Sequence, residues 1–373
     1  MKIGIITYPP RFNYGAILQS YALEKVLARL GHDAWIVQSK PQSKLLTFNL
    51  LIKYFGRIIK RYILKKGNTV LKESENNEDF KVITQRTWKF VETHTKQYYT
   101  TKDFIIKRGD FDCLVVGSDQ IWRAKYFPNI ERNYLDYASG WKIKKIAYAP
   151  SFGVDNWEYS DKQTAHCKKL IKNFLAVSVR EESGILLAKE HFGIDAEFVL
   201  DPTMLLSKED YIKIIKEEHD YDINLALSSY VLDEDENNHN LLSYIAKDKN
   251  MDIFKMIGDP TRIHVPAEHK ILPSFGTWLN MFNRSKFLFT DSFHGTVFAI
   301  IFNLPFVVYG NTERGLSRIN SLLHLFNLEN RLINTIEDYD KIKNTIIDWH
   351  NVNIIKEGMV KQSISFLTKA LND

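Results

Sequence analysis

One unit recurs along the chain: a short apolar run ends in Gly, Ser, Asp or Pro, and in several cases a helical pattern follows. In the N-terminal half these runs lie at residues 2–7, 112–116, 145–149, 176–179 and 196–200. Near-continuous apolar strands that alternate with helices are typical of a parallel sheet covered by helices on both faces. The pattern therefore predicts an α/β fold.

The pattern restarts after Asp201-Pro202, where proline blocks continuation of the preceding strand. A chain of 373 residues is also too long for one ordinary core. We therefore predict a first domain over residues 1–200, a second over 201–345, and a C-terminal helix over 346–373 that can pack back on the first domain. Ligands of such sheets bind beyond the carboxyl ends of the strands, in the cleft that the two domains face. The second series of runs and helices lies at residues 224–231, 234–249, 252–257, 286–290, 296–302 and 304–309.

An insert at about residues 45–77 does not follow this alternation of strands and helices. Within residues 50–66, apolar side chains such as Leu51 and Ile58 share one helical face, and basic ones such as Lys53 and Arg57 share the other. This pattern is typical of a helix that lies on an anionic membrane surface. A helix packed on the domain with a solvated basic face would look the same, and the sequence leaves both interpretations open.

The net charge of +5 is too small to indicate a nucleic-acid partner. The two cysteines, Cys113 and Cys167, form no metal or disulfide pattern, and no His/Cys/Asp/Glu cluster has metal-ligand spacing. No apolar run reaches the roughly 18 residues of a membrane span, and the first residues read as a strand. We expect a cytoplasmic protein that can associate peripherally with the membrane's inner face and that uses no metal and no cofactor.

The sharpest motif is Thr290 to Thr296, which follows a strand and opens an apolar helix. Free N–H groups at a helix start bind anions, Gly295 lets a ligand approach, and Ser292 either caps the helix or bonds a phosphate oxygen. His294 would then lie beside the anion as a general acid. The alternative is a histidine that bonds a local backbone group at a turn.

Arg180 follows another strand, where its guanidinium can grip a carboxylate or phosphate, although a structural salt bridge is the commoner role of an arginine. Ser118 and Asp119 also follow a strand and could bond sugar hydroxyls, or simply cap a helix. Arg314 and Arg318 add cations that could hold a phosphate or lie solvated on a helix.

The first loop, with Asn13, Tyr14 and Gly15, has the same strand–loop–helix pattern. Its polar groups would line the substrate pocket, and Gly15 would permit a tight turn at the helix start. The alternative is ordinary turn chemistry with Asn13 as the helix N-cap.

Taken in order, five motifs resemble those of the polysaccharide pyruvyltransferase family, from the first strand to about Arg331. They are Asn13-Tyr14-Gly15-Ala16-Ile17-Leu18-Gln19, Val116-Gly117-Ser118-Asp119-Gln120-Ile121-Trp122, Ser178-Val179-Arg180-Glu181, Leu200-Asp201-Pro202-Thr203 and Asp291-Ser292-Phe293-His294-Gly295-Thr296. Many members carry Gly-Asp where this chain has Gly15-Ala16, so one carboxylate is missing from the first loop.

The resemblance implies two Rossmann-like domains that face a cleft, a glycosyltransferase-B-like arrangement that works without a metal. It implies phosphoenolpyruvate as donor and a pyruvate ketal on a sugar of a bacterial surface polysaccharide, or of its polyprenyl-diphosphate-linked precursor, as product. Arg180 would grip the donor, and His294 would be the acid–base residue. Two rival hypotheses stay open: a nucleotide-sugar glycosyltransferase of the same fold, and a non-catalytic glycan- or membrane-binding member.

Overall fold

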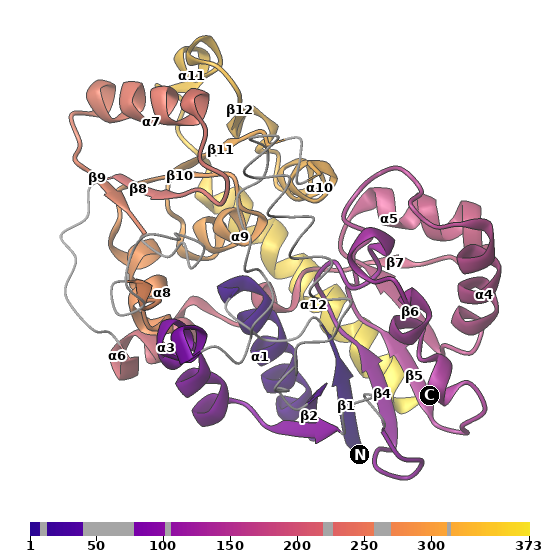
Figure 1. Cartoon of the computed structure of the whole chain (residues 1–373). Helices are drawn as coiled ribbons and strands as arrows, with labels where there is room; N and C mark the ends of the chain where they lie inside the picture. The colour runs from indigo at the N-terminus through magenta and orange to yellow at the C-terminus, as the bar shows by residue number, and fades with distance from the viewer. Residues whose placement is uncertain (8–12, 40–77, 101–105, 219–226, 257–269, 312–314) are drawn as a thin grey trace, which may run out of the picture.

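The structure is a computed structural model that describes residues 1–7, 13–39, 78–100, 106–218, 227–256, 270–311 and 315–373. It contains two parallel β-sheets, one in each half of the chain, with helices on their faces (Figure 1). The α/β class predicted from the sequence is thereby confirmed. The predicted insert at residues 45–77 lies outside the described residues.

The first sheet has seven strands in the order β3-β2-β1-β4-β5-β6-β7. Its centre is fully buried: Ile5 of β1 is paired with Ile36 on one side and Val115 on the other. This burial on both faces explains why the strands read as continuous apolar runs. The strands are β1 (Lys2–Ile6), β2 (Asp33–Ser39), β3 (Gln97–Thr100), β4 (Cys113–Val116), β5 (Lys144–Ala147), β6 (Ala176–Val179) and β7 (Glu197–Phe198).

Helices α1 (Tyr14–Arg29), α3 (Glu78–His94), α4 (Asp161–Ile171) and α5 (Glu182–Leu187) accompany this sheet. Short 3-10 turns and one π-helical turn fill the remaining connections, at η1 (Ala124–Tyr126), η2 (Ile130–Tyr134), η3 (Asp136–Ala138), η4 (Ala188–Phe192) and η5 (Pro202–Leu205). Strands β2 and β3 were not among the predicted runs; polar residues bound both, and their apolar parts are only residues 34–37 and 98–99.

The second sheet has five parallel strands in the order β12-β11-β10-β8-β9. The chain adds β9 on one side of β8 and then returns to add β10 on the other side, so the strand order reverses between β8 and β10. Such a reversal marks the usual ligand position of a Rossmann-like sheet. The strands are β8 (Leu227–Tyr230), β9 (Ile253–Lys255), β10 (Phe287–Thr290), β11 (Phe306–Tyr309) and β12 (Leu332–Ile333). The helices are α6 (Lys208–Glu218), α7 (Glu236–Lys249), α8 (Phe275–Arg284), α9 (Phe293–Phe302), α10 (Ser317–Leu325), η8 (Glu329–Arg331), α11 (Ile336–Ile342) and α12 (Trp349–Asn372).

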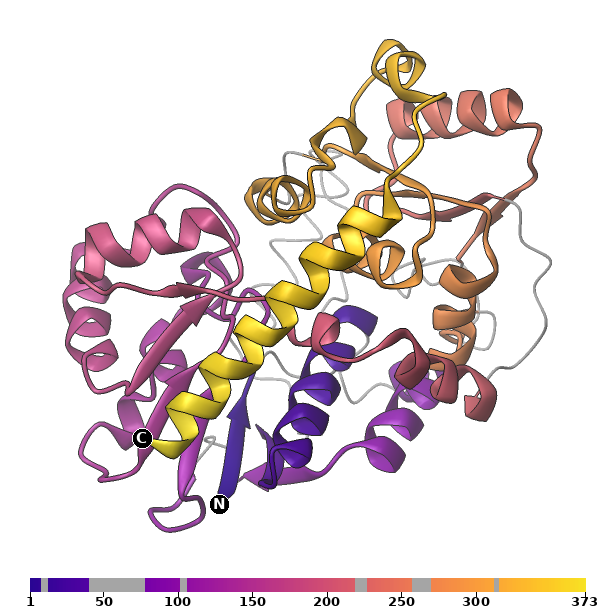
Figure 2. The ribbon, with the colours of Figure 1, turned by 180° about the vertical axis from the view of Figure 1, so that it is seen from behind.

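The two halves share one hydrophobic core. Ile17 of α1 belongs to the same buried cluster as Trp278 of α8 and Phe298 of α9. Helix α12 runs back from the second sheet along the first (Figure 2). There Ser363 Oγ accepts a hydrogen bond from the Leu200 N–H (3.0 Å), and Lys144 Nζ donates to the Leu371 carbonyl (2.6 Å). The halves are therefore fixed relative to each other by apolar packing and by the C-terminal helix.

None of the helices in the described ranges is long and apolar enough to cross a lipid bilayer.

Candidate functional site

The carboxyl ends of the two sheets meet between the halves, close to where α1 and α9 begin (Figure 1). Residues that follow β4, β6 and β7 come from the first half, and residues that follow β10 come from the second. Most of the predicted site residues lie here because parallel strands deliver their carboxyl ends to one edge of each sheet.

Asp201, just after β7, is the centre of this junction. Its Oδ2 accepts hydrogen bonds from Arg180 Nη1 (2.5 Å) and Ser118 Oγ (2.8 Å), and lies 3.8 Å from His294 Nε2. Its Oδ1 accepts from the backbone N–H and hydroxyl of Thr203. Burial would raise the pKa of Asp201, but Arg180, His294 and Thr203 outweigh burial and lower it. Asp201 is therefore an ionised link between the two halves.

Sequence reasoning did not include Asp201 among the site residues, because Asp201-Pro202 read as a domain boundary. The signal that could have found it is its position directly after an apolar run, the same position that Ser118 and Arg180 occupy.

Arg180 lies at the site but is committed to protein partners. Its side chain has no exposed surface, Nη1 bonds Asp201, and Nη2 lies 3.3 Å from Asp119 Oδ1. The guanidinium also lies over the Phe293 ring, at 4.5 Å from its centroid. The predicted direct grip on a ligand is thus replaced by a buried ion-pair network, which leaves only Nε without a hydrogen-bond partner among the described residues.

Ser118 and Asp119 belong to the same network, since both contact the Arg180 guanidinium. Ser118 is fully buried with its hydroxyl on Asp201, so the structure gives it a supporting role in place of the predicted contact with sugar. Asp119 has a left-handed backbone (φ 78°), as does Ala149 (φ 58°) at the end of the neighbouring strand. Strained non-glycine residues of this kind, at about 1–3 kcal/mol each, gather at functional sites.

His294 is the second residue of α9, and its imidazole packs directly against Gly15 at the start of α1. A Cβ atom at Gly15 would overlap the imidazole ring. Gly15 is therefore needed for this close approach, rather than for the tight turn that the sequence suggested. His294 is 7% exposed, and its Nε2 has no hydrogen-bond partner in the described part of the chain. Burial lowers the pKa of His294; Asp201 opposes this shift and Arg180 adds to it.

The start of α9 is fixed by local hydrogen bonds. Ser292 is the N-cap, with its Oγ accepting from the Gly295 N–H (3.3 Å) and its carbonyl accepting from the Thr296 hydroxyl. A Cβ atom at Gly295 would meet the side chains of Thr290 and Tyr230. Gly295 thus allows α9 to pack on β10, and protein atoms fill the space that the sequence assigned to a ligand.

Arg318, in the first turn of α10, brings a second guanidinium to the site. It lies 5.7 Å from the centroid of the Phe293 ring, whereas Arg180 lies 4.5 Å from the same centroid. Burial, followed by repulsion from Arg180, lowers the pKa of Arg318 to about 10. Two buried guanidinium groups against one ring favour the binding of an anion beside them. Arg314 lies outside the described residues.

In the first loop, Asn13 caps α1 through a hydrogen bond from the Ala16 N–H (3.2 Å). Tyr14 is buried, stacks on Trp278 at 5.1 Å, and donates its hydroxyl to the Pro273 carbonyl. The structure therefore places Tyr14 in the core between the halves and not in the predicted substrate pocket.

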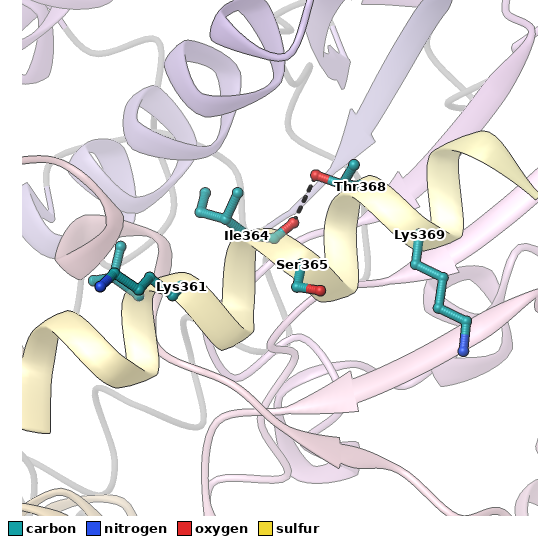
Figure 3. A pocket seen from close by; sticks show the side chains of 6 residues that line it. Lys361, Ile364, Ser365, Thr368 and Lys369 are labelled. Atoms are coloured by element: carbon teal, nitrogen blue, oxygen red, sulfur yellow. Dashed lines mark hydrogen bonds between the residues drawn. The ribbon is translucent and has the colours of Figure 1, made fainter.

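Among the described residues, no group of three or more His, Cys, Asp or Glu could hold a metal ion. An open pocket along the outer face of α12 is lined by Lys361, Ile364, Ser365, Thr368 and Lys369, and there the Thr368 hydroxyl donates to the Ile364 carbonyl (Figure 3). That pocket comes from one helix and contains none of the predicted site residues.

Residues 13–313 match the model of a protein family described as polysaccharide pyruvyl transferase. No curated protein matches the sequence. Among solved structures, UGT89C1 of Arabidopsis thaliana complexed with UDP-L-rhamnose is similar with a TM-score of 0.55 and 8% identity, covering 98% of each chain. UDP-GlcNAc 2-epimerase from Methanocaldococcus jannaschii has a TM-score of 0.49 and 14% identity, over 97% of this chain and 99% of that one. At 8% identity, the likeness to the Arabidopsis structure shows the fold alone, which is the predicted glycosyltransferase-B-like pair of Rossmann-like domains.

Proposed function

The chain belongs to the polysaccharide pyruvyl transferase family, and we propose that it transfers pyruvate from phosphoenolpyruvate to two hydroxyls of one sugar as a cyclic ketal. In this proposal the acceptor is a sugar of a bacterial surface polysaccharide or of its lipid-linked precursor.

The observation that carries the proposal is that one buried imidazole, His294, and two buried guanidinium groups, Arg180 and Arg318, lie at the same junction. His294 Nε2 is buried, faces Asp201 at 3.8 Å, and has no hydrogen-bond partner among the described residues. Arg318 and Arg180 lie against the adjacent Phe293 ring. A proton carrier beside clustered cations suits a substrate that is anionic and must be protonated.

The reaction needs one proton at carbon. His294 donates a proton to the methylene carbon of the enol phosphate, which becomes a methyl group and leaves C2 electrophilic. One sugar hydroxyl bonds to C2 and loses its proton, phosphate departs with the C2–O pair, and the neighbouring hydroxyl then closes the ring and loses its own proton. The products are the ketal and inorganic phosphate. One of the two hydroxyl protons restores the acid on His294 and the other is taken up by the departing phosphate, so the cycle consumes no further reagent.

Arg318, Asp201 and Arg180 have different roles in this reaction. Arg318 holds the donor's phosphate or carboxylate by a charge-assisted interaction. Asp201 orients the imidazole and supports its protonated form, and Arg180 positions Asp201 from behind. The pKa of His294 is lowered without ligand, so an incoming trianion opposes that shift and charges the imidazole when the donor is present.

A glycosyltransferase that uses a nucleotide sugar is the competing proposal, because a solved structure of the same fold was determined with UDP-L-rhamnose. The two differ in what they release. The purified protein is incubated with candidate sugar acceptors and either phosphoenolpyruvate or UDP-sugars, while inorganic phosphate and UDP are measured. Phosphate release together with pyruvate on the acceptor supports the present proposal; UDP release without reaction of phosphoenolpyruvate contradicts it.

Contact with an anionic membrane through residues 50–66 is a separate proposal, and these residues lie outside the described part of the structure. Flotation with anionic vesicles tests it, with Lys53, Lys60 and Arg61 changed to Gln as the matched variant. Binding that survives this change would count against the proposal.

A further inference from the structure

A second pocket, of about 270 Å³, lies at the amino-terminal edge of the second sheet. Its lining includes Lys286, Pro305 and Arg331, which directly precede β10, β11 and β12. His294 follows the opposite end of β10. The length of the strand therefore separates this pocket from the candidate active site.

Three of the four cations that line this pocket make no ion pair within the described residues; the fourth, Lys343, is paired. Within the described residues, the side-chain ammonium groups of Lys249 and Lys286 make no hydrogen bond or ion pair; that of Lys249 lies 4.4 Å from the centroid of the Phe287 ring. Arg331 is 5% exposed and donates from Nη2 to Thr345, while its Nε is buried with no partner in the described part of the chain.

The neighbouring carboxylates are already engaged by other groups. Asp248 accepts from the Tyr339 hydroxyl (2.7 Å) and lies 3.7 Å from Lys343, and Asp340 lies 3.1 Å from Lys343. Burial lowers the pKa of Lys249, Asp248 opposes this, and Arg331 lowers it further. Burial likewise lowers the pKa of Arg331. This corner of the molecule therefore holds positive charge without a matching anion.

Most of the remaining lining is apolar or aromatic and includes Phe287, Tyr339 and Trp349; its other polar members are Lys343, Asn344 and Thr345. Clustered cations beside flat apolar side chains can bind a dianion at one end of a ligand and its apolar body at the other. The geometry points to a second binding site in this pocket, for a small phosphate monoester with an apolar or aromatic body, held by Lys249, Lys286 and Arg331. The site is independent of the pyruvyl transfer proposed for the junction.

Phenyl phosphate is the probe, titrated calorimetrically into the full-length protein. Lys249→Met should weaken its binding about tenfold, the loss of one charge-assisted contact. Lys247→Met, which removes an exposed charge of the same helix, should leave the affinity unchanged, and turnover of phosphoenolpyruvate should be unchanged in both variants. Benzoate, with the same ring but one negative charge, should bind at least about tenfold more weakly.

The junction could also bind the probe, so His294→Ala and Lys286→Met are titrated in parallel. Binding that is weakened about tenfold in the two pocket variants and unchanged in His294→Ala supports the site. Binding that is absent in the unaltered protein, equal for benzoate, or lost only in His294→Ala overturns it. A circular-dichroism melt of each variant identifies any loss that comes from unfolding, and Lys286 is exposed, so its variant keeps the test valid if Lys249→Met is unstable.

Discussion

The imidazole of His294 lies against the backbone of Gly15, so that the start of α9 in the second half touches the start of α1 in the first. This contact leaves no room for a side chain at residue 15. The Nε2 atom of the same imidazole lies 3.8 Å from Asp201 Oδ2.

Gly15→Ala should therefore displace His294 while leaving the two sheets intact. We expect kcat to fall about 100-fold, because a shift of about 1 Å in a catalytic group costs that much. Steady-state kinetics measures the effect, and Gly140→Ala is the control because nothing lies within 4 Å of its added Cβ. Equal kinetics for the two variants would show that the position of His294 is not critical.

Asp201→Asn should affect both stability and catalysis. It removes the carboxylate from Arg180, whose side chain is fully buried, and breaking such a pair costs about 3 kcal/mol or more of unfolding free energy. It also removes the charge that favours protonated His294. Denaturant unfolding and kcat are measured together, with the exposed Asp195→Asn as control. A variant as stable as the control would contradict the assigned ion pair.

Substitution of Arg318 should mainly change substrate binding, whereas substitution of Arg180 should mainly change stability. Arg318→Met should raise the KM for phosphoenolpyruvate about tenfold to a hundredfold, the loss of a charge-assisted bond to the donor. Arg180→Met should mainly lower stability, because it leaves Asp201 buried without its nearest cation. KM values and unfolding midpoints of both variants decide this. A steep rise in KM with normal stability for Arg180→Met would instead place Arg180 on the donor.

The pH dependence follows from the direction of one pKa shift. Burial lowers the pKa of His294 below its usual 6.5, and a general acid works only when protonated. Therefore kcat/KM, which reports the free enzyme, should fall as pH rises through that lowered pKa. The fall in kcat should come at higher pH, because the bound donor stabilises the charged imidazole. If kcat/KM instead increased from about pH 5 to about pH 8, His294 would act as a base or not at all.

The sequence was sufficient for the fold class and for the position of most site residues, because apolar runs mark parallel strands and the residues after them share one edge. It placed His294 and Arg180 near each other for this reason, and both face Asp201 Oδ2 in the structure. It could not assign Tyr14, since a loop tyrosine reads as exposed until Trp278, far away in the chain, is known to stack on it.

Other features also depend on contacts between the halves. The partners of Arg180 come from two other loops, so its burial as an ion pair has no local signal. The same is true of Gly15, whose neighbour His294 lies in the second half. Local patterns report strand ends and caps; they do not report which side chain fills the space between two strand ends.

The central claim is that His294 delivers a proton to the methylene carbon of phosphoenolpyruvate. Reaction in D2O followed by mass spectrometry of the purified ketal tests it most directly, with His294→Ala run in parallel. The account predicts one deuterium in the methyl group of each ketal made by the unaltered protein, and a rate about 100-fold or more lower for the variant. A ketal without that deuterium, or one formed by His294→Ala at the normal rate, would contradict it.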